Sequence, residues 1–383
     1  MTKKILIFAI AMIMLFTIIT SSVSAATITL KIDGVTHTPT IDPVDTNGTA
    51  MIPVRYVFET LGGEVSFNQA KQEITVQTAA HTLVFTIGSK TYTANGTSRT
   101  LPQPVALINS STMVPLESLT AIGATVSYSS STVNINYFTK MTGNLKVNGS
   151  TTLQPIAQAA ADKLMEMNKG LSISVAGGGS GTGINDAKAG TVNIGMSSRE
   201  LTADEMKTLN VYAVANDGIA IIVHPDNPVT NLTTEQARKI FLGEIKNWKD
   251  VGGNNAPILV MTRETGSGTR ATLEEMILDR KSIVETATPF TSSNLIKQAV
   301  AKEKNAIGFD SIGFVDATVK AVSLDSKDAT AETVMNSTYG MGRQLFTCTK
   351  GKATGLSAMF IDYLRSTDCQ NNIVEKEGYV KLK

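Results

Sequence analysis

Two patterns of apolar and polar positions divide the chain. From Thr27 to Tyr137, short stretches of alternating apolar and polar residues are bounded by Gly, Asn, Asp and Ser, which predicts mainly β-strands. From Leu145 onwards, apolar runs alternate with segments whose apolar residues recur every three or four positions, which predicts an α/β domain. We expect a brief linker between the two parts, at residues 139–143.

An internal repeat organises the first part. Met51-Ile52-Pro53-Val54 returns as Met113-Val114-Pro115-Leu116, and Gly62 to Phe67 returns as Gly123 to Tyr128. Each copy predicts a strand, a short helix (54–61 and 116–122) and a hairpin that ends in an alternating strand (73–77 and 132–137). Residues 26–138 resemble the copper amine oxidase N-terminal-like domain, a non-catalytic α+β module of secreted bacterial proteins. The module has only His37 and His81, too few for a metal site, and the resemblance implies adhesion or spacing at the cell envelope, with cell-wall components as partners.

In the α/β part, four strand ends run into loops rich in Ser, Thr and Gly that open helices. The unpaired N–H groups and the positive dipole end of such a helix start attract anions. Ser267 or Thr269 alone could simply cap the helix predicted at 271–278. Four such loops in one domain favour a convergent anion site instead, with Arg263 as its fixed positive charge. The loops are Asn148 to Thr152, Gly177 to Gly183 before a helix at 184–189, Met196 to Arg199, and Glu264 to Thr269.

Composition limits the function classes. Of 383 residues 17% are charged and the formal net charge is +1, which argues against nucleic acid or an anionic membrane as partner and makes any anion specificity local. Residues 1–25 have the pattern of a secretory signal peptide: Lys3 and Lys4, an apolar run from 5 to 19, and a small-residue cleavage site. No cysteine lies near that site, so we expect an exported protein without a lipid anchor. Cys348 and Cys369 could pair or stay as separately buried thiols.

Enzymatic chemistry is not predicted. None of the loops contains the lysine of a nucleotide-hydrolase phosphate loop, and none fits the Gly-x-Ser-x-Gly elbow of a hydrolase. A serine-histidine-aspartate arrangement would depend wholly on His224, whose position before Pro225 at a strand end favours a structural role. We expect neither a metal nor another cofactor.

The α/β part resembles the phosphate-binding proteins of bacterial phosphate ABC transporters. The resemblance spans about 143–383 and implies a type II periplasmic-binding-protein fold, with lobe 1 at 144–221 and 340–383 and lobe 2 at 222–339. It implies that the protein binds inorganic phosphate and delivers it to a permease. The motifs that carry the resemblance are Gly149-Ser150-Thr151-Thr152, Gly179 to Gly183, Leu232-Thr233 followed by Ile240 to Trp248, Arg263 to Thr269, and Ala306-Ile307-Gly308-Phe309.

By motif position, the resemblance assigns eight residues to the phosphate site. Arg263 supplies the charge and the others donate hydrogen bonds through hydroxyl or backbone N–H groups. The eight residues are Thr151, Thr152, Ser180, Ser198, Arg263, Ser267, Gly268 and Thr269.

Two departures from the family pattern bear on the ligand. Ser198 stands where many relatives have the aspartate that accepts the proton of hydrogen phosphate, so discrimination against sulfate is in question. Thr265 replaces a second aspartate, the one that holds the arginine, a role open to Glu264 or another carboxylate. The alternative hypothesis is an envelope-attached sensor or adhesion protein for phosphate or a sulfate-like oxyanion.

Overall fold

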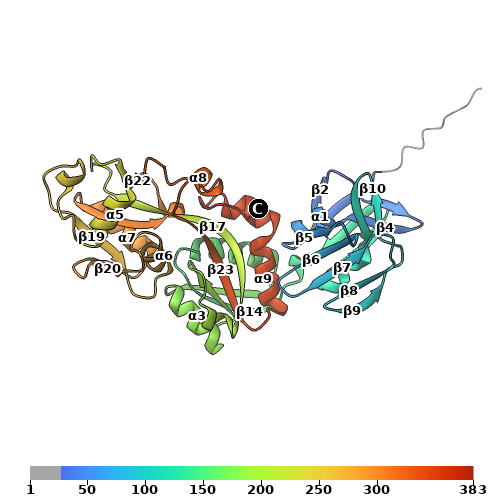
Figure 1. Cartoon of the computed structure of the whole chain (residues 1–383). Helices are drawn as coiled ribbons and strands as arrows, with labels where there is room; N and C mark the ends of the chain where they lie inside the picture. The colour runs from blue at the N-terminus through green and yellow to red at the C-terminus, as the bar shows by residue number, and fades with distance from the viewer. Residues whose placement is uncertain (1–26, 383) are drawn as a thin grey trace, which may run out of the picture.

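The computed structural model describes residues 27–382, and the predicted signal peptide lies outside them. Figure 1 shows three bodies in a row: an N-terminal module of strands, a central lobe and a distal lobe. The chain is a two-lobed α/β protein preceded by an α+β repeat module, as predicted. Among residues 27–382, no helix is both long and apolar enough to cross a membrane.

The repeat predicted from sequence is visible in how the module's strands pair. The equivalent strands β4 (Thr49–Pro53) and β11 (Ser111–Pro115) run antiparallel, with Met113 opposite Pro53 and Pro115 opposite Met51. The two copies therefore meet through the same residues, related by a local two-fold axis. The helix after β4 is α-helical (α1, Val54–Thr60), whereas its counterpart is a 3₁₀ helix (η1, Leu116–Ile122) that ends at left-handed Gly123.

The other strands complete three sheets, ordered β12-β13-β1-β2, β10-β11-β4-β3 and β5-β6-β7-β8-β9. Their bounds are β1 Thr29–Ile32, β2 Val35–His37, β3 Val44–Thr46, β5 Glu64–Asn68, β6 Glu73–Gln77, β7 Thr82–Thr86, β8 Thr91–Ala94, β9 Thr97–Thr100, β10 Ala106–Ile108, β12 Thr125–Ser129 and β13 Thr132–Asn136.

The segment predicted as a linker is packed and hydrogen-bonded. It begins in a 3₁₀ turn, η2 (Phe138–Lys140), and Phe138 and Met141 are buried. The Asp33 carboxylate accepts the backbone N–H groups of residues 137, 138 and 139, and the Asn168 side chain contacts both the carbonyl of Phe138 and the N–H of Met141. The junction is thus part of the core. Its burial was hard to predict because its sequence contains no long apolar run.

One ten-stranded sheet runs through both lobes, with β15-β14-β16-β23-β17-β21-β19-β20 as its main path. Strands β17 (Leu209–Val223) and β23 (Gly342–Lys350) pair antiparallel and connect the lobes. Residues Val214 and Ala215 of β17 join the core shared by lobe 1 and the module, whereas Ile219 to Val223 join the separate core of lobe 2. The remaining elements of lobe 1 are β14 Gly143–Gly149, α2 Gln154–Met167, β15 Leu171–Gly177, α3 Ser180–Ala189, β16 Ile194–Ser197, α4 Ala203–Met206, α9 Gly355–Arg365, α10 Thr367–Cys369 and the π-helix η5 Gln370–Val374.

Lobe 2 buries Trp248, the only tryptophan, in its core. The predicted capping box is present, because Thr233 and Gln236 exchange hydrogen bonds at the start of α5. The two cysteines do not pair, since both are free and buried in different clusters. The elements of lobe 2 are β18 Asn231–Leu232, α5 Thr234–Phe241, η3 Trp248–Val251, β19 Leu259–Arg263, α6 Gly268–Met276, β20 Thr288–Phe290, α7 Ser293–Lys302, β21 Ala306–Ser311, η4 Ile312–Phe314, β22 Lys320–Leu324 and α8 Ala331–Met335.

The module docks against helix α9 of lobe 1 through a buried carboxyl group. Asp362 accepts the backbone N–H of Ala79 at 2.7 Å and the hydroxyl of Tyr137 at 2.8 Å. Close by, Gly62 lies so near α9 that a Cβ there would be 1.9 Å from the carbonyl oxygen of Asp362. Because apolar residues of the module and of lobe 1 form one continuous cluster, the two pack as one body.

A substitution at Gly62 should separate the effect of docking from that of backbone strain. Gly62 (φ +84°) and Gly88 (φ +80°) both have left-handed backbones, but a Cβ at Gly88 would meet no atom within 4 Å. Alanine should cost roughly 1–2 kcal/mol of strain at either position. We expect the free energy of unfolding to fall by roughly 1–3 kcal/mol more in Gly62→Ala than in Gly88→Ala, because α9 must shift. Thermal unfolding of both variants tests this, and equal losses would show that the docking tolerates the methyl group.

The docking should also depend on pH. Burial raises the pKa of Asp362 to about 7, so the folded chain keeps a proton that the unfolded chain loses from about pH 4. The free energy of unfolding should therefore fall as pH rises between these values, by on the order of 1 kcal/mol per pH unit, and level off above. Asp362→Asn should flatten that slope in denaturant titrations from about pH 4 to about pH 8. Parallel profiles for the two proteins would contradict this assignment.

Candidate oxyanion-binding site

The four predicted loops all lie at the carboxyl ends of parallel strands. Three follow β14, β15 and β16 of lobe 1, and the fourth follows β19 of lobe 2. Two of the helices start earlier than predicted: α3 begins at Ser180 and α6 at Gly268. Ser180, Gly268 and Thr269 therefore lie in first turns, where backbone N–H groups have no partner within the helix.

The loops of the two lobes meet. Thr152 Oγ1 and Thr269 Oγ1 are 3.0 Å apart, and the Gly181 N–H donates to the carbonyl of Gly266 at 2.9 Å. Within lobe 1, Ser180 Oγ lies 3.2 Å from Ser198 Oγ and accepts the Ser198 N–H at 3.0 Å. All eight predicted site residues are buried, and the structure brings them together from both lobes.

Ser267 also has the capping role that was the alternative for this loop. Its side chain accepts the N–H of Arg270 at 3.3 Å at the start of α6. Capping and anion binding are compatible here, because a cap uses one N–H group of the first turn and leaves the earlier ones available.

Arg263 is the only positive charge among the eight residues, and it is 1% exposed. Its guanidinium donates to Ser293 Oγ and to Thr151 Oγ1, both at 3.1 Å, and to two backbone carbonyls of the segment before α7. Glu264 Oε1 lies 3.3 Å away and is its nearest carboxylate partner. A buried guanidinium needs such partners, so Glu264 takes the position left open by Thr265.

Sequence reasoning missed an ion pair on the crossover strands. Asp217 and Arg343 face each other in the register of β17 and β23, and the guanidinium donates twice to the carboxylate, at 2.7 and 2.9 Å. Arg343 also donates to the carbonyl oxygen of Ser198 at 2.9 Å, so the pair holds the loop after β16. The available signal was a lone carboxylate in β17 and an arginine near the start of β23, which only the register makes meaningful.

A second missed group is Asp310, at the end of β21. It is 1% exposed, and burial raises its pKa to about 6, against the opposing effects of the Ser311 N–H, the Arg263 charge and the nearby Ser293 side chain. Its Oδ2 atom is buried without a hydrogen-bond partner. Asp310 and Ser293 thus lie on the lobe 2 side of Arg263.

Two other kinds of site, a metal centre and a catalytic site built on His224, have no comparable grouping of residues within 27–382. Among residues 27–382, no three His, Cys, Asp or Glu side chains are grouped so that they could hold a metal ion. The ring of His224 accepts the N–H of Asp226 at 3.0 Å, a local turn contact that fits the structural role expected for it.

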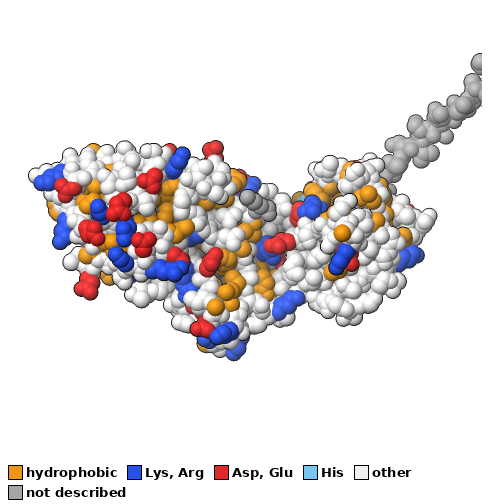
Figure 2. All heavy atoms as spheres, in the orientation of Figure 1, with side chains coloured by type: hydrophobic (Ala, Val, Ile, Leu, Met, Phe, Trp, Pro, Cys, Tyr) orange, Lys and Arg blue, Asp and Glu red, His pale blue; other side chains and the backbone are white. Residues whose placement is uncertain are grey.

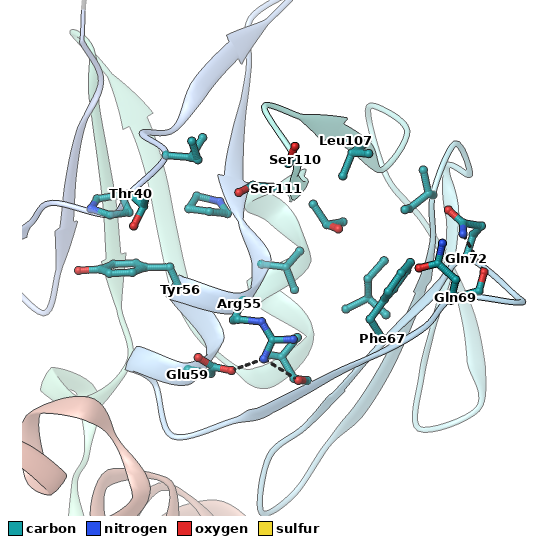
Figure 3. A pocket seen from close by; sticks show the side chains of 18 residues that line it. Thr40, Arg55, Tyr56, Glu59, Phe67, Gln69, Gln72, Leu107, Ser110 and Ser111 are labelled. Atoms are coloured by element: carbon teal, nitrogen blue, oxygen red, sulfur yellow. Dashed lines mark hydrogen bonds and ion pairs between the residues drawn. The ribbon is translucent and has the colours of Figure 1, made fainter. Parts of the chain in front are cut away.

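The N-terminal module has a pocket of its own, which differs from the site around Arg263. Figure 3 shows it lined by side chains such as Phe67, Leu107 and Tyr56, with Arg55 turned toward Glu59. That ion pair is 2.7 Å long, and Arg55 also donates to the carbonyl of Val65. Arg55 is the only cation that lines this pocket, and 60% of its side chain is exposed, so water screens its charge, whereas Arg263 is buried.

Surface charge adds no broad attraction for anions. On the face seen in Figure 2, acidic and basic side chains are intermixed over the distal lobe, and much of the module is uncharged. This agrees with the formal net charge of +1. Anion binding must therefore arise within the site itself.

Comparison with known proteins gives the same picture for both parts of the chain. The PBP superfamily domain matches residues 124–368, and the copper amine oxidase N-terminal domain matches residues 31–137. The phosphate-binding protein PstS of Bacillus subtilis is 39% identical over 247 residues, which are 63% of this chain and 82% of that protein. PstS of Borreliella burgdorferi is 29% identical over 252 residues, 62% of this chain and 90% of that one.

Solved structures agree. A crystal structure from Clostridium perfringens, described as a phosphate ABC transporter substrate-binding protein with bound phosphate, is 37% identical with a TM-score of 0.61, covering 63% of this chain and all (100%) of that one. An ABC-type phosphate transport receptor from Vibrio cholerae is 36% identical with a TM-score of 0.54, over 62% and 100% of the two chains. The chain therefore belongs to the PBP superfamily and, in the part that follows its copper amine oxidase N-terminal domain, to the family of the phosphate-binding protein PstS.

Proposed function

We propose that the protein is an extracytoplasmic phosphate-binding protein that closes its two lobes on inorganic phosphate and delivers it to an ABC transporter permease. The observation that carries this proposal is the buried Arg263 guanidinium, surrounded by neutral donors from both lobes. The family relationship supports phosphate as the ligand, and the signal-peptide pattern of residues 1–25 supports export.

Binding exchanges the water shell of phosphate for fixed donors. The first turns of α2, α3 and α6 present N–H groups and the positive ends of their dipoles, and the hydroxyls of Thr151, Ser180 and Thr269 add further donors. Each charge-assisted hydrogen bond contributes about 1.5–3 kcal/mol, so a set of them offsets desolvation of the ion and lobe closure. No bond of the ligand is made or broken.

Closure is a movement of lobe 2 against lobe 1, which β17 and β23 connect. The contacts between Thr152 and Thr269, and between Gly181 and Gly266, are those that a closed form needs. Phosphate touches both lobes and thereby favours this form. The joined surface of the two lobes is what a permease would recognise.

Removing the Arg263 guanidinium should abolish high-affinity binding. We expect Arg263→Ala to weaken phosphate binding at least about 100-fold, since two or more charge-assisted hydrogen bonds and the only site cation are lost. Calorimetric titration of the mature protein, stripped of bound ligand, measures this. Arg280→Ala is the matched control, because that arginine is in the same lobe with 81% of its side chain exposed. Unchanged affinity in Arg263→Ala would refute the site.

Gly268 offers a test of closure. A Cβ at this position would lie 2.4 Å from Ser180 Oγ and 2.6 Å from Ser198 Oγ, both in the other lobe. Gly268→Ala should therefore weaken phosphate binding by about tenfold or more and leave a larger radius of gyration in saturating phosphate. Small-angle scattering provides the radius. Gly340→Ala is the control, since a methyl group there meets no atom within 4 Å. Compaction of Gly268→Ala equal to that of the wild type would rule out this route of closure.

A further inference from the structure

The site as described has many donors but needs an acceptor. Hydrogen phosphate carries a proton at neutral pH and sulfate does not, so a protein separates them by offering an acceptor to that proton. Ser198 Oγ, at the position where the resemblance places an aspartate, is already engaged with Ser180 Oγ at 3.2 Å. The acceptor must therefore be sought among the buried carboxylates around Arg263.

Two of the three nearby carboxylates already pair with an arginine. Glu264 contacts the Arg263 guanidinium through Oε1 at 3.3 Å; its Oε2 also lacks a hydrogen-bond partner, but 28% of this side chain is exposed. Asp217 receives two hydrogen bonds from Arg343 and one from the Ser311 hydroxyl at 2.6 Å. Asp310 differs: its Oδ1 accepts the Ser311 N–H at 2.9 Å, and its buried Oδ2 has no hydrogen-bond partner.

Strand register places Asp310 beside the arginine. Val260 of β19 pairs with Ile307 of the parallel strand β21, so Arg263 and Asp310, each three residues further on, occupy matching positions on the same face. Ser293 lies near both, because its Oγ accepts from Arg263 Nη1 at 3.1 Å and its side chain is close enough to lower the pKa of Asp310. Thr151 of lobe 1 accepts the Ser293 N–H and so reaches the same cluster.

The charged and titratable groups around Asp310 come from every neighbouring element. Arg263 on β19 and Arg343 on β23 favour its ionised form, Asp217 on β17 is a further carboxylate, and the hydroxyl of Tyr379 comes from the C-terminal segment. Arg343 is largely engaged with Asp217, so Arg263 is the other nearby cation that favours the ionised form of Asp310. Burial outweighs these charges and raises the pKa of Asp310 to about 6, so the carboxyl is mostly ionised at neutral pH.

We propose that Asp310 is the carboxylate that accepts the proton of bound hydrogen phosphate and excludes sulfate. The inference rests on the proposed function. Hydrogen phosphate supplies the hydrogen that the unpartnered Oδ2 lacks, so the complex satisfies both groups without net proton uptake. Sulfate would place a bare oxygen against a buried carboxylate and could bind only after Asp310 has taken up a proton.

The wild-type protein provides the first test. Titration calorimetry with phosphate and with sulfate from about pH 5 to about pH 8 should show that sulfate affinity falls about tenfold for each pH unit above about 6, since one proton is required. Phosphate should still bind tightly at about pH 8. Sulfate binding that does not vary with pH, or that is absent even at about pH 5, would overturn the proposal.

Asp310→Asn provides the second test. An amide can present an N–H donor to sulfate, so this variant should bind sulfate equally well across the pH range and should bind phosphate at least about tenfold more weakly. Asp250→Asn, an exposed substitution in the same lobe, should keep the wild-type profile for both ions. Thermal unfolding checks that the variant folds, and the wild-type pH profile decides the question if it does not.

The outcomes separate this inference from the proposed function. Phosphate binding that is lost in Arg263→Ala, together with continued exclusion of sulfate by folded Asp310→Asn, would overturn the role of Asp310 alone. A wild-type protein that binds no phosphate at any pH would overturn the proposed function and this inference together.

Discussion

The buried charge of Arg263 is the constraint on which the ligand-binding part depends. A guanidinium that is 1% exposed is tolerated only if its donors have partners, and these come from Thr151 in lobe 1 and from Glu264, Ser293 and backbone carbonyls in lobe 2. The same requirement that stabilises the arginine therefore draws the lobes together. A tetrahedral oxyanion can replace the neutral partners as hydrogen-bond acceptors and can neutralise the charge as well. Such a ligand would therefore stabilise the buried arginine better than the neutral partners do.

The rest of the fold fixes where that charge lies. Strands β17 and β23 cross between the lobes, and their Asp217–Arg343 pair anchors the carbonyl of Ser198. The N-terminal module shares its core with lobe 1 and docks through Asp362, so it adds mass to one side of the hinge only. In the proposed closure, lobe 2 would then be the smaller moving body.

Periodicity and motifs predicted much of this. The repeat, most strands, the capping box at Thr233 and the four loops between strand ends and helix starts follow from local patterns that tertiary structure did not override. Asp217, Asp310 and Arg343 could not be found in that way. Their meaning depends on strand register, because Asp310 acquires its place only when β21 lies beside β19. The packing of the junction predicted at 139–143 was not foreseen for a similar reason: partners distant in sequence, such as Asn168, hold it.

The two departures from the family pattern have a common physical solution. The sequence lacks one carboxylate for the arginine and one for the ligand proton, yet the buried site still contains carboxylates next to the vacated positions. Glu264 is adjacent in sequence to Thr265, and Asp310 enters from a neighbouring strand. In the proposed complex, which residue provides a carboxylate would matter less than the match of donors and acceptors. The charges of Arg263, Glu264, Asp310 and a hydrogen phosphate dianion do not cancel, so the neutral N–H and hydroxyl donors of the loops would have to stabilise the ion, while the carboxylate accepts its single hydrogen.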